Sequence, residues 1–308
     1  MRAFIFPGQG SQAVGMGAAL AAASRSAADV FAEVDEALGQ NLFRLMRDGP
    51  DEELKLTENA QPAIMAHSIA VLRTWGVRLT DITSFVAGHS LGEYSALCAA
   101  GSFDLATTAK LLKLRGQAMQ RAVPVGQGAM AALLGADLEL AQKIADAAAQ
   151  GDVCTVANDN DPSQVVISGH KAAIDRAIEM AKEMGAKRAV SLPVSAPFHC
   201  PLMQPAAEAM RDALSYVVLE PPAVPVYANV TAQPETDADA IRNQLVEQVT
   251  GMVRWRESVI NMSDAGVHEF VELGGKVLGT MVKRIAPDAK VTSIVTIEDV
   301  EALAKEIA

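Results

Sequence analysis

Short apolar runs, each followed by a longer helical pattern, recur along most of this chain of 308 residues. The first two runs, at residues 4–6 and 85–87, end at glycine-containing turns. Later strand candidates and the helical patterns between them lie at residues 224–230, 237–249, 268–273, 277–285 and 291–295. Runs without polar alternation are typical of strands buried on both faces of a parallel sheet. The sequence therefore predicts an α/β fold.

One stretch departs from this simple alternation. Strand and helix patterns follow one another in the order βαββαβ at residues 129–134, 137–149, 154–157, 165–168, 171–184 and 189–194, and the polar run 158–162 is expected to connect the two middle strands. This order is typical of the ferredoxin-like arrangement. We therefore predict a small ferredoxin-like subdomain over residues 126–195, inserted into a larger α/β domain formed by residues 1–125 and 196–308. A cleft between two such units is a usual place for a functional site.

The charge and composition of the chain exclude several classes of protein. A net charge of −11 argues against nucleic acid or an anionic membrane as the main partner. Three cysteines without a CxxC pair indicate a reducing compartment. The first apolar run is too short for a signal peptide, and no apolar stretch reaches the ~18 residues of a membrane helix. We therefore expect a soluble, cytoplasmic protein, and because nothing in the sequence demands an oligomer, a monomer.

The strongest local signal is Gly88-His89-Ser90-Leu91-Gly92, which follows the strand candidate 85–87 and opens a helical pattern over residues 93–100. A serine between two glycines at a strand-to-helix corner is a nucleophile elbow, which projects the hydroxyl out of a sharp turn. The helix N-terminus supplies N–H donors and a positive dipole near an oxyanion. The alternative is a chance match in a tight turn, but the strand and helix context favours Ser90 as a nucleophile.

A serine hydroxyl is a weak nucleophile and needs a base, for which the chain offers five histidines. His199 follows the last strand of the small subdomain, in a loop that two prolines stiffen, and we interpret it as the base. The other four fit core, capping or solvated positions better: His67, His89, His170 and His268. No carboxylate stands out as a third member. A backbone carbonyl could orient the histidine instead, because the ring N–H needs only an acceptor.

The glycine loop Gly8-Gln-Gly-Ser-Gln-Ala13 loosely matches a dinucleotide-binding fingerprint. That interpretation fails because the residues that follow keep a helical pattern, whereas the fingerprint needs a second strand carrying an acidic residue. Another use of the loop is to bring the backbone N–H of Gln9 beside the nucleophile. Together with the N–H of Leu91 it would form an oxyanion hole. The open alternative is a plain turn.

Arg115 lies on the apolar stripe of the helical pattern at residues 106–120, with Leu111, Ala118 and Met119 as its neighbours on that face. A buried guanidinium is unfavourable unless it meets an anion. One alternative is a structural ion pair with a carboxylate of the protein. The other is a bidentate grip on the carboxylate of a substrate, for which an arginine fork is well suited.

With these candidate residues in this order, the sequence resembles the malonyl-CoA–acyl carrier protein transacylases of bacterial fatty acid synthesis over nearly its whole length. The landmarks that carry the resemblance appear in order as FPGQGSQ at 6–12, QPA at 61–63, GHSLGE at 88–93, LRGQAMQ at 114–120, GAMAALLG at 128–135, SAPFHCPLM at 195–203 and Gln248 before VRW at 253–255. The set in this order is far more specific than any one motif. The resemblance departs near residues 272–276, where this chain is one residue shorter.

The resemblance implies an α/β-hydrolase-like core and a set of catalytic roles. Ser90 would be the nucleophile that becomes malonylated, and His199 the general base. The backbone carbonyl of Gln248 would orient the histidine, which would account for the missing acidic residue. The backbone amides of Gln9 and Leu91 would form the oxyanion hole.

The resemblance also implies the substrates. Arg115 would bind the malonyl carboxylate. In related polyketide acyltransferases, an aliphatic residue after the nucleophile and a phenylalanine before the histidine accompany a preference for malonyl. Leu91 and Phe198 match these two positions. The expected partners are malonyl-CoA and an acyl carrier protein, with coenzyme A as the leaving group and phosphopantetheine as the acceptor. No metal or redox cofactor is expected. The rival functions are a serine hydrolase, a polyketide acyltransferase with another carrier, and a non-catalytic carrier-binding protein.

Overall fold

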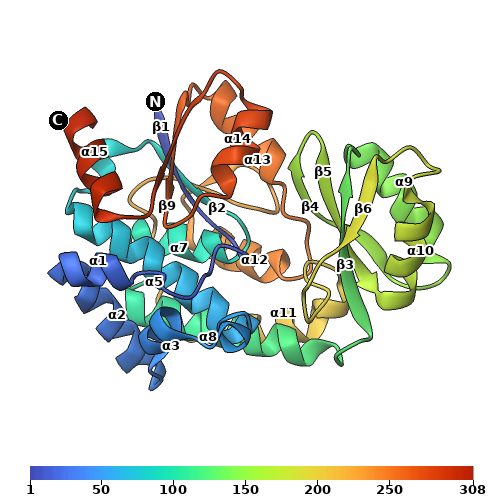
Figure 1. Cartoon of the computed structure of the whole chain (residues 1–308), viewed down its shortest axis with the longest axis horizontal. Coiled ribbons are helices and arrows are strands. Elements are labelled where there is room, and N and C mark those ends of the chain that lie inside the picture. The colour runs from blue at the N-terminus through green and yellow to red at the C-terminus, as the bar shows by residue number, and fades with distance from the viewer. Residues whose placement is uncertain (308) are drawn as a thin grey trace.

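The protein is a mixed α/β structure with two separate sheets, seen in a computed structural model that describes residues 1–307 (Figure 1). The larger sheet has six strands in the order β10-β9-β1-β2-β7-β8. Its strands are β1 (Arg2–Phe6), β2 (Phe85–Gly88), β7 (Val226–Tyr227), β8 (Pro234–Glu235), β9 (Glu269–Leu273) and β10 (Lys290–Ile294). All neighbours are parallel except β7 and β8, so the parallel sheet expected from the apolar runs is confirmed.

Helices cover both faces of the larger sheet, which explains why its strands lack polar alternation. Phe4 and Phe6 of β1 join a core that includes residues of α5 (Thr57–Trp75) and α8 (Leu105–Ala122). Ala3 and Ile5 point to the opposite face, where they pack with residues of α13 (Trp255–Asp264) and α14 (Leu278–Ile285). Because both faces are covered, β1 is apolar and buried from Ala3 to Phe6.

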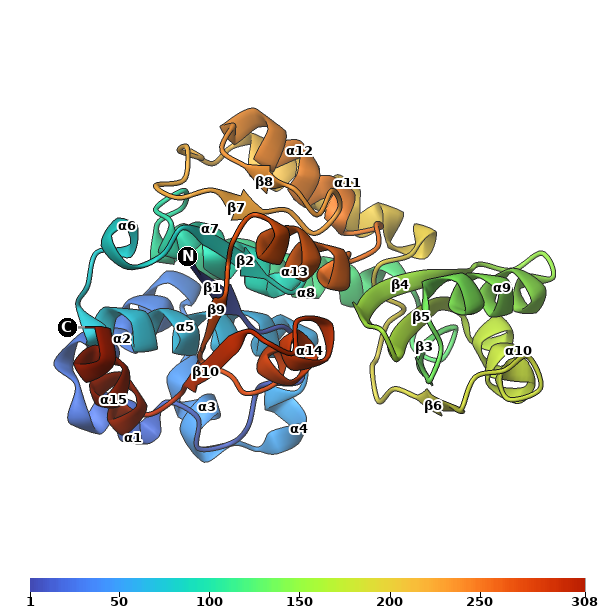
Figure 2. The same ribbon diagram turned by 90° about the horizontal axis from the view of Figure 1, so that it is seen from above.

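The remaining helices complete the layers around the larger sheet (Figures 1 and 2). They are α1 (Ala18–Ala23), α2 (Arg25–Leu38), α3 (Leu42–Asp48), α4 (Asp51–Leu54), α6 (Leu79–Ile82), α7 (Leu91–Ala99), the 3₁₀ helix η1 (Pro201–Met203), α11 (Gln204–Ser215), α12 (Ala238–Gln248) and α15 (Ile297–Ile307). Several begin at the side-chain caps that such helices favour, for example Asp104 before α8 and Asp237 before α12. Within residues 1–307 no helix is both long enough and apolar enough to span a membrane.

The smaller sheet is antiparallel, with four strands in the order β4-β5-β3-β6. Its elements are β3 (Gly128–Leu134), α9 (Leu138–Ala149), β4 (Cys154–Asp161), β5 (Gln164–His170), α10 (Lys171–Ala181) and β6 (Arg188–Ser191). The predicted order of strands and helices in this stretch is therefore confirmed. Residues of α9 and α10 form a separate apolar core with the sheet, and these elements stand apart from the larger sheet in both views (Figures 1 and 2).

The polar run 158–161 is the main difference from the sequence prediction, because it belongs to β4 and is buried, whereas a connecting loop was expected. Asp161 is 0% exposed and its carboxylate lies 2.9 Å from a guanidinium nitrogen of Arg284 on α14. Asp159 lies 3.0 Å from Arg256 on α13. These partners come from helices about 100 residues further along the chain, so a local pattern could not show that the carboxylates are neutralised in the interior.

Two predicted strands are shorter than expected. The run 224–230 forms a strand only at β7, and within the run 189–194 the strand β6 ends at Ser191, with one further backbone hydrogen bond from Leu192 to Met130. Residues beyond these short strands contribute to the site: Asn229 contacts the nucleophile, and residues 192–194 line the cavity beside it.

Candidate active site

Ser90 lies at the corner between β2 and α7, with φ 54° and ψ −111°. This conformation is unfavourable for a residue with a side chain and persists only where the surroundings enforce it. A Cβ atom on Gly88 would lie 1.9 Å from the carbonyl carbon of Gly92, and one on Gly92 would lie 2.2 Å from the carbonyl oxygen of Phe6. Only glycine fits at either position, so the two glycines that flank Ser90 allow β1, β2 and α7 to meet at the elbow.

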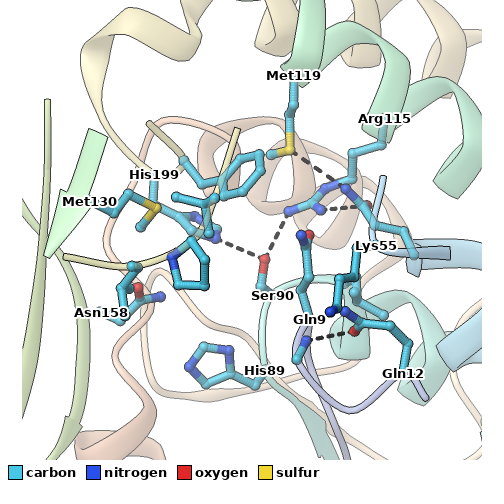
Figure 3. A pocket seen from close by; sticks show the side chains of 17 residues that line it. Gln9, Gln12, Lys55, His89, Ser90, Arg115, Met119, Met130, Asn158 and His199 are labelled. Carbon is cyan, nitrogen blue, oxygen red and sulfur yellow. Dashed lines mark hydrogen bonds between the residues drawn. The ribbon is translucent and has the colours of Figure 1, made fainter. Parts of the chain in front are cut away.

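The hydroxyl of Ser90 contacts His199, with 2.8 Å between Oγ and Nε2 (Figure 3). The other ring nitrogen, Nδ1, lies 2.9 Å from the carbonyl oxygen of Gln248 and 3.1 Å from that of Gly251. Because both neighbours are acceptors, the hydrogen-bond network assigns the ring hydrogen to Nδ1. The lone pair of Nε2 then faces the serine hydroxyl, as a base requires.

His199 is held in its neutral form. Burial, and next the positive charge of Arg115, lower the pKa of His199 from 6.5 to about 3. Both causes act against the charged imidazolium. At neutral pH the ring can therefore accept the proton of Ser90.

Arg115 lies on α8, is 1% exposed, and extends its guanidinium to the same place (Figure 3). Its Nη1 donates to Oε1 of Gln61 at 2.7 Å, and its Nη2 donates to Oε1 of Gln248 at 2.9 Å and to Ser90 Oγ at 3.1 Å. No carboxylate within residues 1–307 forms a salt bridge with it. The structural ion pair considered from the sequence is therefore absent from the described residues, and the guanidinium has neutral partners only.

Gln9 and Leu91 both line the cavity that also contains Ser90. Gln9 follows β1, and its neighbour Gly8 packs so closely on His89 that a Cβ atom there would lie 2.8 Å from the His89 carbonyl oxygen. Leu91 is the first residue of α7, where backbone N–H groups have no acceptor within the helix. Among the residues described, neither N–H donates a hydrogen bond. Both are therefore available to an oxyanion in the cavity.

A cavity of about 450 Å³ opens over Ser90, His199 and Arg115. Gln9, Leu91 and Gln61 line its floor with them. Its apolar wall is formed by Met119, Met130, Leu192, Pro193, Val194 and Phe198. Phe198 thus lines the cavity among these apolar side chains. The volume is within the range of small-molecule sites.

Two of the other histidines, His67 and His89, do not face the nucleophile. His67 is buried on α5, with Nδ1 3.2 Å from the carbonyl oxygen of Gly274, so the predicted core position is confirmed. The ring of His89 points away from Ser90, and its Nε2 lies 2.8 Å from Oδ1 of Asn160 (Figure 3). No group of three or more metal-binding side chains occurs within residues 1–307.

Two polar residues of the site, Asn229 and Glu93, were not predicted from the sequence. Asn229 accepts a hydrogen bond from the N–H of Ser90 at 2.8 Å and donates one to the carbonyl oxygen of Gly88 at 2.7 Å, so it clamps the elbow. Glu93 is 2% exposed, and burial raises its pKa to about 7 against the hydrogen bonds from Gln248 and Asn229. A signal for Glu93 was its place in the first turn after the nucleophile, whereas Asn229 had none.

Comparison with known proteins defines the class to which this fold and site belong. A family model described as the acyl transferase domain matches residues 3–293. That match covers both sheets and every site residue named above. By class, the chain is an acyl transferase.

More similar proteins narrow the class. The chain is 46% identical to the malonyl CoA-acyl carrier protein transacylase of Escherichia coli K12 over 284 residues, which cover 92% of each protein. The acyl-carrier-protein S-malonyltransferase of Bartonella henselae superposes with a TM-score of 0.97 at 50% identity over 99% of each chain. A malonyl-transacylase solved in complex with a type II PKS acyl-carrier protein gives 0.96 at 41% identity, with 99% of each chain covered. The chain belongs to the family of malonyl CoA-acyl carrier protein transacylases.

Proposed function

We propose that this enzyme transfers the malonyl group from malonyl-CoA to the phosphopantetheine thiol of holo acyl carrier protein, through a malonyl ester of Ser90. The observation that carries the proposal is a buried guanidinium, Arg115, with neutral partners only and 3.1 Å from the nucleophilic oxygen. An acyl group that carries its own carboxylate would supply the missing anion. The names of the relatives point to the same acyl group and the same acceptor.

In the first half of the reaction, Nε2 of His199 takes the proton of Ser90 as Oγ attacks the thioester carbonyl carbon. The negative charge that develops on the carbonyl oxygen is stabilised by the N–H groups of Gln9 and Leu91. When the tetrahedral intermediate collapses, the carbon–sulfur bond breaks and the proton on His199 passes to the sulfur of coenzyme A. Arg115 holds the malonyl carboxylate throughout.

The second half reverses these steps with another thiol. His199 takes the proton of the phosphopantetheine thiol, and the sulfur attacks the ester carbonyl of malonyl-Ser90. The bond to Oγ breaks, and the proton returns from His199 to Ser90. The proposed chemistry uses no metal and no redox cofactor, because each step moves only a proton and an acyl group. All the residues involved come from one chain, so a cytoplasmic monomer would suffice.

We also infer that the larger unit, residues 1–125 and 196–308, is an α/β-hydrolase-like core and that residues 126–195 are a ferredoxin-like insertion. A parallel sheet with the nucleophile at the end of β2 supports the first assignment. The element order βαββαβ and the antiparallel strand order support the second. Expressing residues 126–195 alone tests the boundary: a cooperative thermal transition supports it, and an unfolded fragment contradicts it.

Intact-protein mass spectrometry tests the proposed reaction. Mixing the enzyme with malonyl-CoA should give a malonyl adduct on Ser90, and adding holo acyl carrier protein should move that adduct to the carrier. Carriers of fatty acid and of polyketide synthesis, added in separate reactions, would show which is the acceptor. An adduct that decays to free malonate without reaching either carrier would make the enzyme a hydrolase. No adduct at all would contradict the substrate or the site.

The pH profile of acylation follows from the neutral state of His199. The second-order rate constant kcat/KM for malonyl-CoA reports the free enzyme. In Glu93→Gln, which lacks a carboxyl group whose pKa is about 7, we expect it to keep most of its value down to about pH 5, because the pKa of His199 is about 3. A histidine with a pKa of about 6.5 would be mostly protonated at that pH. A limb near pH 7 that is present only in the wild type reports the protonation of Glu93 and not of His199. An acid limb centred near pH 6.5 in both proteins would contradict a neutral, buried base.

A further inference from the structure

Glu93 is a buried carboxylate to which the mechanism above assigns no role. It lies in the first turn of α7, three residues after Ser90, and forms no salt bridge within residues 1–307. Its Oε2 accepts two hydrogen bonds, one from the N–H of Asn229 at 3.1 Å and one from Nε2 of Gln248 at 2.7 Å. Burial raises the pKa of this carboxyl group, and the two neutral donors and the positive charge of Arg115 offset that effect only in part.

Glu93 helps to fix the orientation of the side-chain amide of Gln248. The NH₂ group of that amide donates to Glu93 Oε2, to the carbonyl oxygen of Ser90 at 3.0 Å and to Oδ1 of Asn229 at 3.3 Å, while its oxygen accepts from Nη2 of Arg115 at 2.9 Å. If the amide were turned over, its oxygen would face these acceptors and its NH₂ group would face the guanidinium. These contacts would be repulsive, and the ionised carboxylate, at the shortest distance of the three acceptors, is the strongest single determinant of the orientation.

The orientation of the Gln248 amide determines how Arg115, the group proposed to bind the substrate carboxylate, is held. With the amide fixed, its oxygen holds Nη2 of Arg115 on one side, and Gln61 holds Nη1 at 2.7 Å on the other. The fork is thereby aimed at Ser90 Oγ, 3.1 Å from Nη2. Contacts thus connect Glu93 through Gln248 to Arg115. Neither Glu93 nor Gln248 is among the residues that line the cavity.

We propose that Glu93 is a positioning residue for acyl-group selection, because its carboxylate orients the Gln248 amide and thereby the guanidinium that receives the malonyl carboxylate. This inference rests on the proposed function, in which Arg115 binds that carboxylate. Glu93 touches neither substrate nor reacting atoms and acts only through Gln248.

The test compares three variants with malonyl-CoA and with acetyl-CoA, which lacks the carboxylate. Glu93→Met keeps the length of the side chain but accepts no strong hydrogen bond. We expect kcat/KM for malonyl-CoA to fall roughly 10- to 100-fold, as for a buried donor left without its acceptor, with most of the loss in KM. The loss with acetyl-CoA should be several times smaller. Glu93→Gln offers one oxygen to the same two donors and should restore the malonyl-to-acetyl ratio towards that of the wild type.

Ser95→Ala is the matched comparison, because it alters the same helix and its hydroxyl has no hydrogen-bond partner among the described residues. It should leave the malonyl-to-acetyl ratio unchanged. The proposal is overturned if Glu93→Met leaves that ratio unchanged, if Ser95→Ala shifts it as much, or if folded Glu93→Gln fails to restore it. If Glu93→Met does not fold, Glu93→Ala replaces it with the same expected shift in the ratio. A wild-type enzyme that takes no malonyl group would instead refute the proposed function itself.

Discussion

Ser90→Ala is expected to lower malonyl transfer by about 10⁴-fold or more, the scale seen when a serine nucleophile is removed from a working site. Its Oγ contacts both the base, at 2.8 Å, and the guanidinium, at 3.1 Å. The malonyl adduct should disappear from the intact-protein mass spectrum, and transfer to the carrier should disappear with it.

A matched control for this variant is Ser95→Ala on the same helix. The hydroxyl of Ser95 is buried and has no hydrogen-bond partner among the described residues, so its removal should leave both adduct and rate near those of the wild type. If folded Ser90→Ala still forms the adduct in full, the nucleophile lies elsewhere.

Arg115→Ala is expected to lower kcat/KM for malonyl-CoA by roughly 10²- to 10³-fold, as expected when one partner of a buried ion pair is removed. The acetyl group makes no use of the guanidinium, so activity with acetyl-CoA should rise relative to malonyl-CoA. Steady-state kinetics with the two thioesters measures both changes. The variant removes a donor from Gln61 and Gln248 as well, so some loss with acetyl-CoA is expected.

Lys110→Ala is the control for the arginine, since it removes an exposed positive charge from the same helix. It should leave the malonyl-to-acetyl ratio unchanged. An equal proportional loss with both thioesters in Arg115→Ala would show that the arginine supports the nucleophile alone and does not select the acyl group.

The parts of this site that could be predicted from the sequence have local causes. The elbow is specified by glycines two residues before and after Ser90, directly after a buried strand. Arg115 stands out because a charge on an apolar stripe is rare enough to need a reason. The alternation of strands and helices also has a local cause, namely the spacing of apolar residues along the chain. It predicted the order of the elements in both sheets.

The parts that could not be predicted depend on contacts between distant segments. Nothing around Gln248 marks it locally, and only the family resemblance pointed to its carbonyl. Its side-chain contacts with Glu93 and Arg115 join three separate helices. The polar run 158–161 has the pattern of a connecting loop, because the arginines that neutralise its carboxylates lie 97 and 123 residues away in the sequence. Patterns of burial and propensity carry no information about such pairings.

Ser90 and His199 have φ angles of 54° and 57°, a region that residues with side chains rarely occupy. Each such residue costs of order 1–3 kcal/mol of folding free energy. The two reacting groups are thus also two weak points of the scaffold. Glycine adopts such φ angles without this strain, so the backbone geometry that serves the reaction also limits the thermal stability of the enzyme.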